Sequence, residues 1–298
     1  MRIASLVPSS TEMLFALGLG DQVVAVTHEC DHPPAAAELP HLSDTVIPEG
    51  LSPAEIDAEV KRVVGLGQPL YGLKRDVLLS AEPDLIVAQD VCAVCAVSYD
   101  DVVSIAAGMP NRPEVLKQDP TNLAGVFENC IEVATAAGIP DAGHRLKSEL
   151  QARVDRVSSA VAGADRRSVI ALEWLDPPFT GGHWVPEMIQ LAGGMDLVGR
   201  AGDKSAETTW EQLDGLDPDV VVVMPCGFYV EEAAAQAREY LGRIKSLGPA
   251  RIYAVDAAAS YSRPGPRLVE GIELLGHLLH PELVPAPEGL PFEAIGAG

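Results

Sequence analysis

The chain has 298 residues, 47% of them hydrophobic and 21% charged, a composition ordinary for a folded protein long enough for two lobes. Asp and Glu number 43 against 21 Lys and Arg, which gives a formal net charge of −22 at pH 7. Such a surface repels phosphate backbones and anionic lipid, which argues against nucleic acid and against a membrane surface as partners. The sequence also lacks an apolar run of about 20 residues, so no membrane span is predicted.

The start of the chain does not read as an export signal. Its apolar run, Ile3–Val7, is too short for the hydrophobic region of a signal peptide and ends at Pro8. We therefore expect a cytoplasmic protein, or an extracytoplasmic one if a leader has been removed. Because cytoplasmic thiols stay reduced, the 5 cysteines are not expected to form a disulfide framework.

The first part of the chain predicts alternating strands and helices. Apolar runs without polar alternation indicate strands covered on both faces, which is typical of parallel sheets. The predicted strands are Arg2–Val7, Gln22–Thr27 and Asp84–Ala88, and the predicted helices are Ser9–Leu17, Pro53–Val64 and Lys74–Ala81.

A long helical stretch over residues 122–162, broken near Gly138, is expected to connect two lobes. Beyond it we predict strands and helices again, and an irregular tail after Pro281. The strands are Ser168–Glu173, Asp219–Met224 and Arg251–Val255, and the helices are Pro186–Ala192, Glu231–Leu241 and Arg267–Leu279. The expected domains are an N-terminal α/β lobe over 1–120, a connecting long helix over 121–163 and a C-terminal α/β lobe over 164–298. An acid-Pro-Asp sequence before a strand in each lobe suggests that the two are built alike.

Cysteines follow three of the predicted strands. Ligands of open parallel sheets bind at the carboxyl ends of the strands, so these positions are candidates for a site. Cys30, Cys92, Cys95 and Cys226 would together suit zinc or an iron–sulfur cluster, since thiolates are preferred ligands of both. Plain structural thiols, or a redox-active Cys92–Cys95 pair, remain alternatives. Cys130 lies inside a predicted helix and is expected to be a small buried hydrophobe.

Other side chains at strand ends and in rigid loops are candidate ligand contacts. The loop Asp176–Trp184 combines prolines, glycines and aromatic residues, which suits the wall of a cleft. The candidates are His28, Glu29, Gln89, Phe179, His183, Trp184, Trp210, Tyr261 and Arg263. The motifs of phosphate-binding loops, dinucleotide-binding folds, serine hydrolases and zinc proteases are all missing from the sequence. No catalytic residue is predicted.

Short segments carry a resemblance to a known family through their order and spacing. They are Leu6–Gly18, Asp31–Pro34, Glu82–Val87, Pro177–Gly182, Ala192–Gly194 and Ser262–Arg267. Together they resemble the class III substrate-binding proteins of ABC transporters, the group that binds cobalamin and iron–siderophores, and most closely its cobalamin-binding member. The resemblance covers nearly the whole chain. It implies the helical-backbone periplasmic-binding-protein fold: α/β, with two lobes of mainly parallel sheets flanked by helices, joined by one long interlobe helix.

The resemblance also implies a ligand between the lobes and an ABC permease as partner. Aromatic residues line the cleft of the cobalamin binder, and Phe179 and Trp210 match that pattern. The family docks on its permease through an acidic residue on each lobe; Asp76 falls near the first, and no counterpart of the second is evident.

We therefore predict a substrate-binding protein, rather than an enzyme, that holds a corrinoid (cobalamin) or another metal-containing ligand in the interlobe cleft, with the cysteines contacting metal. The alternative is a cytoplasmic iron–sulfur or zinc metalloprotein with a redox or metallocofactor-handling role on the same fold. A reversible redox titration of a bound cluster would favour the alternative, and tight corrinoid binding without redox change would favour the binding protein.

Overall fold

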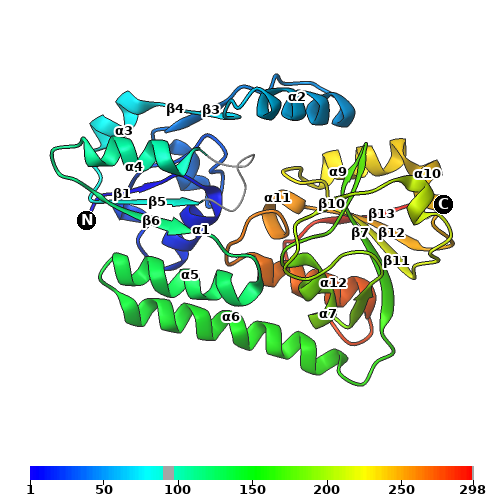
Figure 1. Ribbon diagram of the computed structural model, residues 1–298. Coiled ribbons are helices and arrows are strands. Elements are labelled where there is room, and N and C mark those ends of the chain that lie inside the picture. Colours follow the sequence, from blue (N-terminus) through cyan, green and yellow to red (C-terminus); the bar gives the residue numbers. More distant parts are fainter. Residues whose placement is uncertain (90–96, 297–298) are drawn as a thin grey trace. The chain divides into compact units, whose positions relative to one another are not determined.

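The structure, a computed structural model, describes residues 1–89 and 97–296 (Figure 1). Its packing divides the chain into two compact units. Unit 1 comprises Met1–Pro120 and Ala124–Glu149, and unit 2 comprises Thr121–Leu123 and Leu150–Gly298. The division falls inside the long helix α6, Pro140–Val161, whose first turns pack with unit 1.

A parallel sheet of four strands forms the centre of unit 1. Its order is β2 (Val23–Ala25), β1 (Ile3–Ser5), β5 (Leu85–Gln89) and β6 (Glu114–Gln118). Every residue of β1 and β5 is buried, as the unbroken apolar runs predicted. The expected α/β class with mainly parallel strands is thereby confirmed in this unit.

Helices cover the sheet of unit 1, and two further strands form a small separate sheet (Figure 1). The helices are α1 (Pro8–Ala16), α2 (Pro53–Gly65), α3 (Arg75–Ala81), α4 (Tyr99–Ala107) and α5 (Leu123–Ala136). This small sheet pairs β3 (Ser43–Thr45) with β4 (Tyr71–Leu73) in antiparallel fashion, and α2 lies between the two strands in the chain. Its two strands were not predicted, because neither is an apolar run.

Close packing of α6 on α5 depends on Gly143. A Cβ atom there would lie 2.7 Å from Ala134 Cβ and 2.8 Å from the Cys130 carbonyl oxygen, so only glycine allows this approach. Cys130 is fully buried at this contact, as expected, and burial raises the pKa of its thiol to about 12. It is an inert part of the packing.

Unit 2 holds a larger sheet of mixed direction. Its order is β10, β8, β7, β11, β12 and β13, with β9 pairing along β7. The strands β7, β9, β11 and β12 run parallel, and β8, β10 and β13 run antiparallel to their neighbours. Their bounds are β7 (Arg167–Leu175), β8 (Pro178–Thr180), β9 (Gly194–Asp196), β10 (Ala206–Glu207), β11 (Val220–Val223), β12 (Arg251–Val255) and β13 (Phe292–Ile295).

The strand β13 corrects the prediction of an irregular tail. Phe292 and Ile295 pair with β12, and Ile295 is 6% exposed within the core of the unit. The proline- and glycine-rich stretch before β13 obscured this short apolar segment in the sequence. The helices of unit 2 are α7 (Val185–Leu191), α8 (Trp210–Leu213), α9 (Val230–Glu239), α10 (Leu241–Lys245), α11 (Ala257–Ser260) and α12 (Leu268–Leu279).

The two acid-Pro-Asp sequences make the same kind of hydrogen bond between neighbouring strands, one in each unit. The Asp84 carboxylate, before β5, accepts a hydrogen bond of 2.8 Å from the backbone N–H of Arg2, before β1. The Asp219 carboxylate, before β11, accepts one of the same length from the N–H of Ser168 in β7. Each aspartate therefore ties the starts of two neighbouring parallel strands together.

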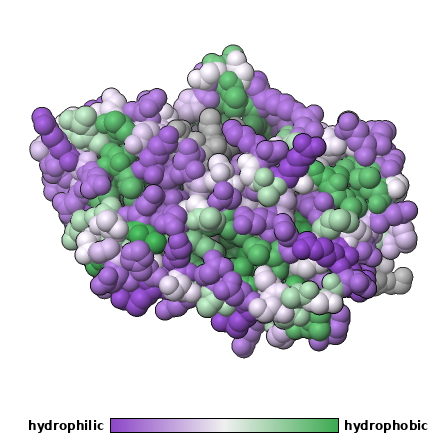
Figure 2. Space-filling view, turned by 60° about the horizontal axis from the view of Figure 1, so that its bottom comes forward, coloured by the Kyte–Doolittle hydropathy of each residue, from purple (hydrophilic) through white to green (hydrophobic). Residues whose placement is uncertain are grey.

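One face of the molecule can be judged by the hydropathy of its residues. Figure 2 shows one face, on which hydrophilic residues predominate between smaller apolar patches. Within the residues that the structure describes, none of the helices has the length and hydropathy of a membrane-crossing segment. The charge of −22 accounts for this hydrophilic character.

Candidate functional site

A tight turn follows β2 at the carboxyl edge of the sheet in unit 1. The backbone N–H of Cys30 donates to the carbonyl oxygen of Thr27 at 3.2 Å, which places His28 and Glu29 at the corners of the turn. The Cys30 sulfur lies 3.1 Å from the hydroxyl oxygens of both Thr11 and Thr27, and the residue is 2% exposed. Cys30 thus points inward and holds the turn against α1.

His28 and Glu29, in contrast, contact the two-stranded sheet β3–β4. Nδ1 of His28 lies 2.8 Å from Ser43 Oγ, and its ring centroid is 5.5 Å from that of Tyr71. The Tyr71 hydroxyl donates to Glu29 Oε1 at 3.0 Å. Burial lowers the pKa of the half-buried His28 imidazole, so the ring is neutral near pH 7.

Gln89, the last residue of β5, is a third polar group at this edge. It is 6% exposed, and its Oε1 has no hydrogen-bond partner in the described part of the chain. A buried amide oxygen without a partner costs folding free energy, so this atom is a candidate acceptor for a ligand.

In unit 2, aromatic side chains gather at the carboxyl end of β7 and after β11. The rings of Trp174 and Phe228 lie 5.5 Å apart at 47°, and Phe179 of β8 pairs across the strands with Trp174. Cys226 lies beside them and is exposed, with its backbone N–H bonded to the Glu173 carbonyl oxygen at 3.0 Å. Trp174 and Phe228, both partly exposed, therefore offer an apolar surface.

The side chain of Glu173 binds two loops together. It accepts hydrogen bonds from the Gly182 N–H at 3.0 Å and from the Ser205 hydroxyl. Burial raises the pKa of this carboxyl to about 7, although both hydrogen bonds lower it and only nearby Asp196 adds to the rise. Glu173 is therefore a titrating group close to neutral pH.

His183 lies in the loop that Glu173 holds. Its backbone has a φ of 51°, in the left-handed region, and its N–H donates to the Asp203 carbonyl oxygen at 2.5 Å. Burial, and to a smaller extent the charge of Lys204, lowers the pKa of its imidazole. The neutral ring lies at the edge of unit 2 beside Trp184, with ring centroids 5.3 Å apart.

The remaining predicted aromatic contacts lie inside unit 2. Trp184, 5% exposed, donates from Nε1 to the Tyr261 carbonyl oxygen at 2.7 Å, and the Tyr261 hydroxyl donates to Gly271 at 3.1 Å. Trp210 is 8% exposed and stacks on Tyr240. These three side chains leave a ligand little surface to contact, whereas Arg263 is half-buried and nearer to solvent.

The metal site predicted from four cysteines stays a prediction. Cys92 and Cys95 lie outside the described residues, and Cys30 and Cys226 belong to different units. Among the residues that are described, no three His, Cys, Asp or Glu side chains come together as metal ligands. Neither zinc nor an iron–sulfur cluster gains support from the structure.

Several site residues were not selected from the sequence. Trp174 directly follows the predicted strand Ser168–Glu173, so the rule of strand ends could have found it. Ser43 and Tyr71 carried no such signal, because only the pairing of β3 with β4 brings them beside His28.

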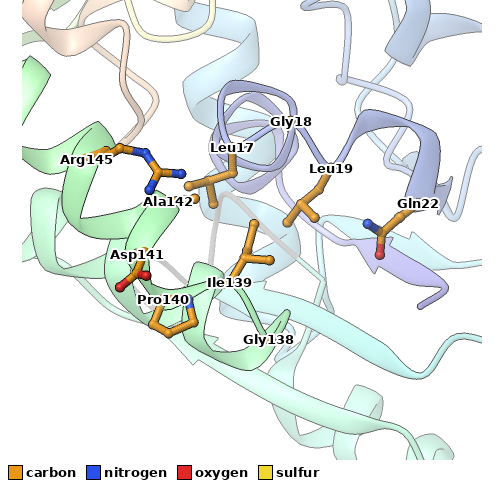
Figure 3. Close-up of a pocket in the computed structure, with 10 residues that line it drawn as sticks. All are labelled: Leu17, Gly18, Leu19, Gln22, Gly138, Ile139, Pro140, Asp141, Ala142 and Arg145. Atoms are coloured by element: carbon orange, nitrogen blue, oxygen red, sulfur yellow. The ribbon is translucent and has the colours of Figure 1, made fainter.

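Unit 1 also contains a cavity of about 540 Å³ between the ends of α1 and α5 (Figure 3). Gly18 and Gly138 end these helices with φ values of 77° and 78°, which glycine adopts without strain. Leu17, Leu19 and Ile139 make its apolar surface. Because Gln22 precedes β2 and His28 follows it, the cavity lies at the opposite end of β2 from the site. The lining residues are Leu17, Gly18, Leu19, Gln22, Gly138, Ile139, Pro140, Asp141, Ala142 and Arg145.

Parallel strands with polar and aromatic groups at their carboxyl ends are typical of α/β ligand-binding proteins. The family model described as periplasmic binding protein matches residues 3–246. The chain belongs to this periplasmic binding protein family, and it is a substrate-binding protein.

Similar proteins agree with this assignment. The uncharacterized ABC transporter substrate-binding lipoprotein YvrC of Bacillus subtilis is 25% identical over 94% of this chain and 80% of its own length. The vitamin B12-binding protein of Yersinia pestis is 23% identical over 78% of this chain and 73% of its own. The periplasmic heme-binding protein of Roseiflexus sp. RS-1 shares the fold, with a TM-score of 0.68, 23% identity, and coverage of 92% and 96% of the two chains.

These relatives overturn the expectation of a cytoplasmic protein. The Bacillus subtilis relative is named as a lipoprotein of an ABC transporter, and the Roseiflexus protein and the family model are described as periplasmic. These descriptions are of extracytoplasmic proteins. The expectation was wrong because it rested only on the first residues of the given sequence. The argument that cytoplasmic conditions keep the cysteines reduced falls with it.

Proposed function

We propose that this protein binds a corrinoid, with cobalamin as its ligand, and presents it to an ABC permease. The observation that carries the proposal is the Trp174–Phe228 pair beside the exposed Cys226 at the carboxyl edge of the unit 2 sheet. A corrin ring is broad and flat and carries a metal at its centre. Aromatic rings provide the extended apolar contact that such a face needs.

Unit 1 has a candidate polar contact of its own, at the carboxyl edge of its four-stranded sheet. The buried Gln89 Oε1 can accept a hydrogen bond from one of the amide side chains on the rim of a corrin ring. The exposed Asp76, in the first turn of α3, is the acidic residue proposed to contact the permease. Ligand and partner would then meet different parts of unit 1.

The relatives support cobalamin and leave heme as the second candidate. One relative is named for vitamin B12 and one structural neighbour for heme. Both ligands are planar metal macrocycles, so the aromatic surface suits either of them. They differ at the rim, since a corrin carries neutral amides and heme carries carboxylates, which the charge of −22 disfavours.

The test is isothermal titration calorimetry of the purified protein with cyanocobalamin and, separately, with hemin. Phe228→Ala is expected to weaken cyanocobalamin binding by about five- to thirtyfold, since loss of an aromatic contact costs about 1–2 kcal/mol. The matched control is Leu216→Ala, because Leu216 is 38% exposed and precedes β11, whereas Phe228 follows it. If hemin binds and cyanocobalamin does not, or if both variants behave alike, the proposal is wrong.

A further inference from the structure

An exposed segment of unit 2, residues 199–205, lies against the loop that leads into α7. This segment, termed the strap, runs from the turn after β9 to the start of β10. Its residues 200–204 are exposed and include no large apolar side chain. A segment with so little apolar burial can open by itself, provided that its polar contacts with the rest of the unit are released.

Backbone contacts fix the strap to the loop. The His183 N–H donates to the Asp203 carbonyl oxygen at 2.5 Å, and the Gly202 N–H donates to the His183 carbonyl oxygen at 2.8 Å. A Cβ atom on Gly182 would lie 2.1 Å from the Ser205 nitrogen, so the two backbones are in direct contact. The loop and the strap therefore move apart only if these hydrogen bonds break.

The carboxyl group of Glu173 holds both sides of this contact. It accepts one hydrogen bond from the Gly182 N–H of the loop, at 3.0 Å, and another from the Ser205 hydroxyl of the strap. Burial raises the pKa of the carboxyl to about 7. Opening of the strap removes the Ser205 hydroxyl and admits water, so the ionised form of Glu173 is favoured in the open state.

Asp196 is a second carboxyl, at the start of the strap. Its Oδ1 accepts from the N–H groups of Val198 and Gly199 at 3.0 and 2.8 Å, whereas its buried Oδ2 forms no hydrogen bond with any residue that the structure describes. A Cβ atom on Gly199 would lie 2.5 Å from this Oδ2 and 2.7 Å from the Gly181 carbonyl oxygen. Both oxygens border the same small space, where two acceptors repel each other unless Asp196 is protonated. Burial raises the pKa of this carboxyl too.

The charges around the two carboxyls reinforce this preference. Among the described groups, only Asp196 changes the pKa of Glu173 through its charge, and it raises that pKa further. Two like charges in a buried place disfavour each other, so each carboxyl favours the protonated form of the other. The other charged and titratable groups on the adjoining segments are His183 in the loop, Arg200, Asp203 and Lys204 in the strap, and Cys226 after β11.

We propose that the strap is a pH-sensitive closure of unit 2, held shut by protonated Glu173 and Asp196 and opened locally when they ionise. Phe179 of β8 precedes the loop and pairs with Trp174, so opening would loosen one edge of the aromatic surface. The inference concerns unit 2 alone and does not depend on the ligand.

The size of the effect follows from linkage between ionisation and opening. A carboxyl with a pKa of 4.5 when exposed and about 7 when buried favours the closed strap at low pH. The closed form loses stability as the pH rises from 4.5 to 7. For Glu173 alone, the open fraction should rise about seventyfold between pH 5 and pH 8, and ionisation of Asp196 adds to this rise.

Hydrogen–deuterium exchange of the full chain at pH 5 and pH 8 measures this opening. After correction for the intrinsic exchange rates, the protection factors of the His183 and Gly202 amides should fall about seventyfold or more. Low urea concentrations should leave these two amides unchanged, because local opening exposes little surface. The amides of β11 exchange through unfolding of the unit, so their protection should be higher and should decrease with urea.

Substitutions that keep the hydrogen bonds but remove the ionisation identify the groups responsible. Glu173→Gln and Asp196→Asn should each reduce the dependence on pH, and the double variant should keep its protection within about twofold between pH 5 and pH 8. The matched control is Asp203→Asn, which removes an exposed carboxylate from the strap itself and should behave as the wild type.

Several outcomes would overturn the inference. If the two wild-type amides respond to urea as β11 does, the strap does not open by itself, and this result requires no variant to fold. A dependence on pH that survives in the double variant, or that Asp203→Asn abolishes, would assign the effect to other groups.

Discussion

Replacing Glu173 with Gln should stabilise unit 2 at alkaline pH. The pKa of this carboxyl is raised by burial from 4.5 to about 7, which means that the folded protein prefers the protonated form. Each pKa unit corresponds to about 1.4 kcal/mol. The wild type therefore loses stability as pH rises from 4.5 to 7, by about 0.8 kcal/mol at pH 5 and about 3 kcal/mol at pH 8.

The variant avoids this loss because its amide never ionises. Its oxygen can still accept from the Gly182 N–H, and the Ser205 hydroxyl can accept from its nitrogen. We expect a gain of about 2 kcal/mol in the free energy of unfolding at pH 8 and less than about 1 kcal/mol at pH 5.

Urea denaturation followed by tryptophan fluorescence measures this effect in one unit. All 3 tryptophans, Trp174, Trp184 and Trp210, belong to unit 2, so the signal reports on that unit. Glu211→Gln, at an exposed position of α8, is the control for loss of one charge. If Glu173→Gln is less stable than the wild type at pH 8, or if its gain is the same at both pH values, Glu173 is not a buried carboxyl with a raised pKa.

Two other substitutions test the packing that supports the site. Gly182→Ala should lower the stability of unit 2 by more than about 2 kcal/mol, because a Cβ there would lie 2.1 Å from the Ser205 nitrogen; a variant with wild-type urea resistance would contradict this. Asp219→Ala should cost about 1 kcal/mol at pH 7 through its lost hydrogen bonds with Ser168. These hydrogen bonds lower the pKa of the carboxyl, so its stabilisation is present above about pH 4 and is lost as the pH falls further. An equal cost at pH 7 and pH 2.5 would show that the charge is irrelevant.

Much of the fold could be predicted because its central strands are unbroken apolar runs. The runs before Gln89 and Met224 are buried on both faces of a sheet, so burial alone defines them as strands. The short strands β3, β4, β8, β9 and β10 lack such a pattern. They form only because neighbouring strands and loops hold them, and that information is not local in the sequence.

The sequence allows candidate site residues to be chosen from topology, but it does not give the direction of a side chain. The rule that ligands meet the carboxyl ends of strands singled out His28, Glu29 and Gln89 from the sequence. It could not show that Cys30 points inward, since the turn that decides this is closed by Thr27 and by Thr11 on another element. Burial of Trp184 against Tyr261 likewise depends on a contact across 77 residues.

Within each unit, the contacts that align the strands lie away from the candidate ligand contacts, which makes binding variants informative. Asp84 and Asp219 join the strands at their starts, whereas His28 and Phe228 follow strands at the opposite edge. The hydrogen bonds that set the alignment of the parallel strands are therefore remote from the side chains proposed to meet the ligand. A substitution at His28 or Phe228 removes a group from the rim of a sheet that is held elsewhere, so a loss of affinity in these variants reports on ligand contact rather than on unfolding of the sheet.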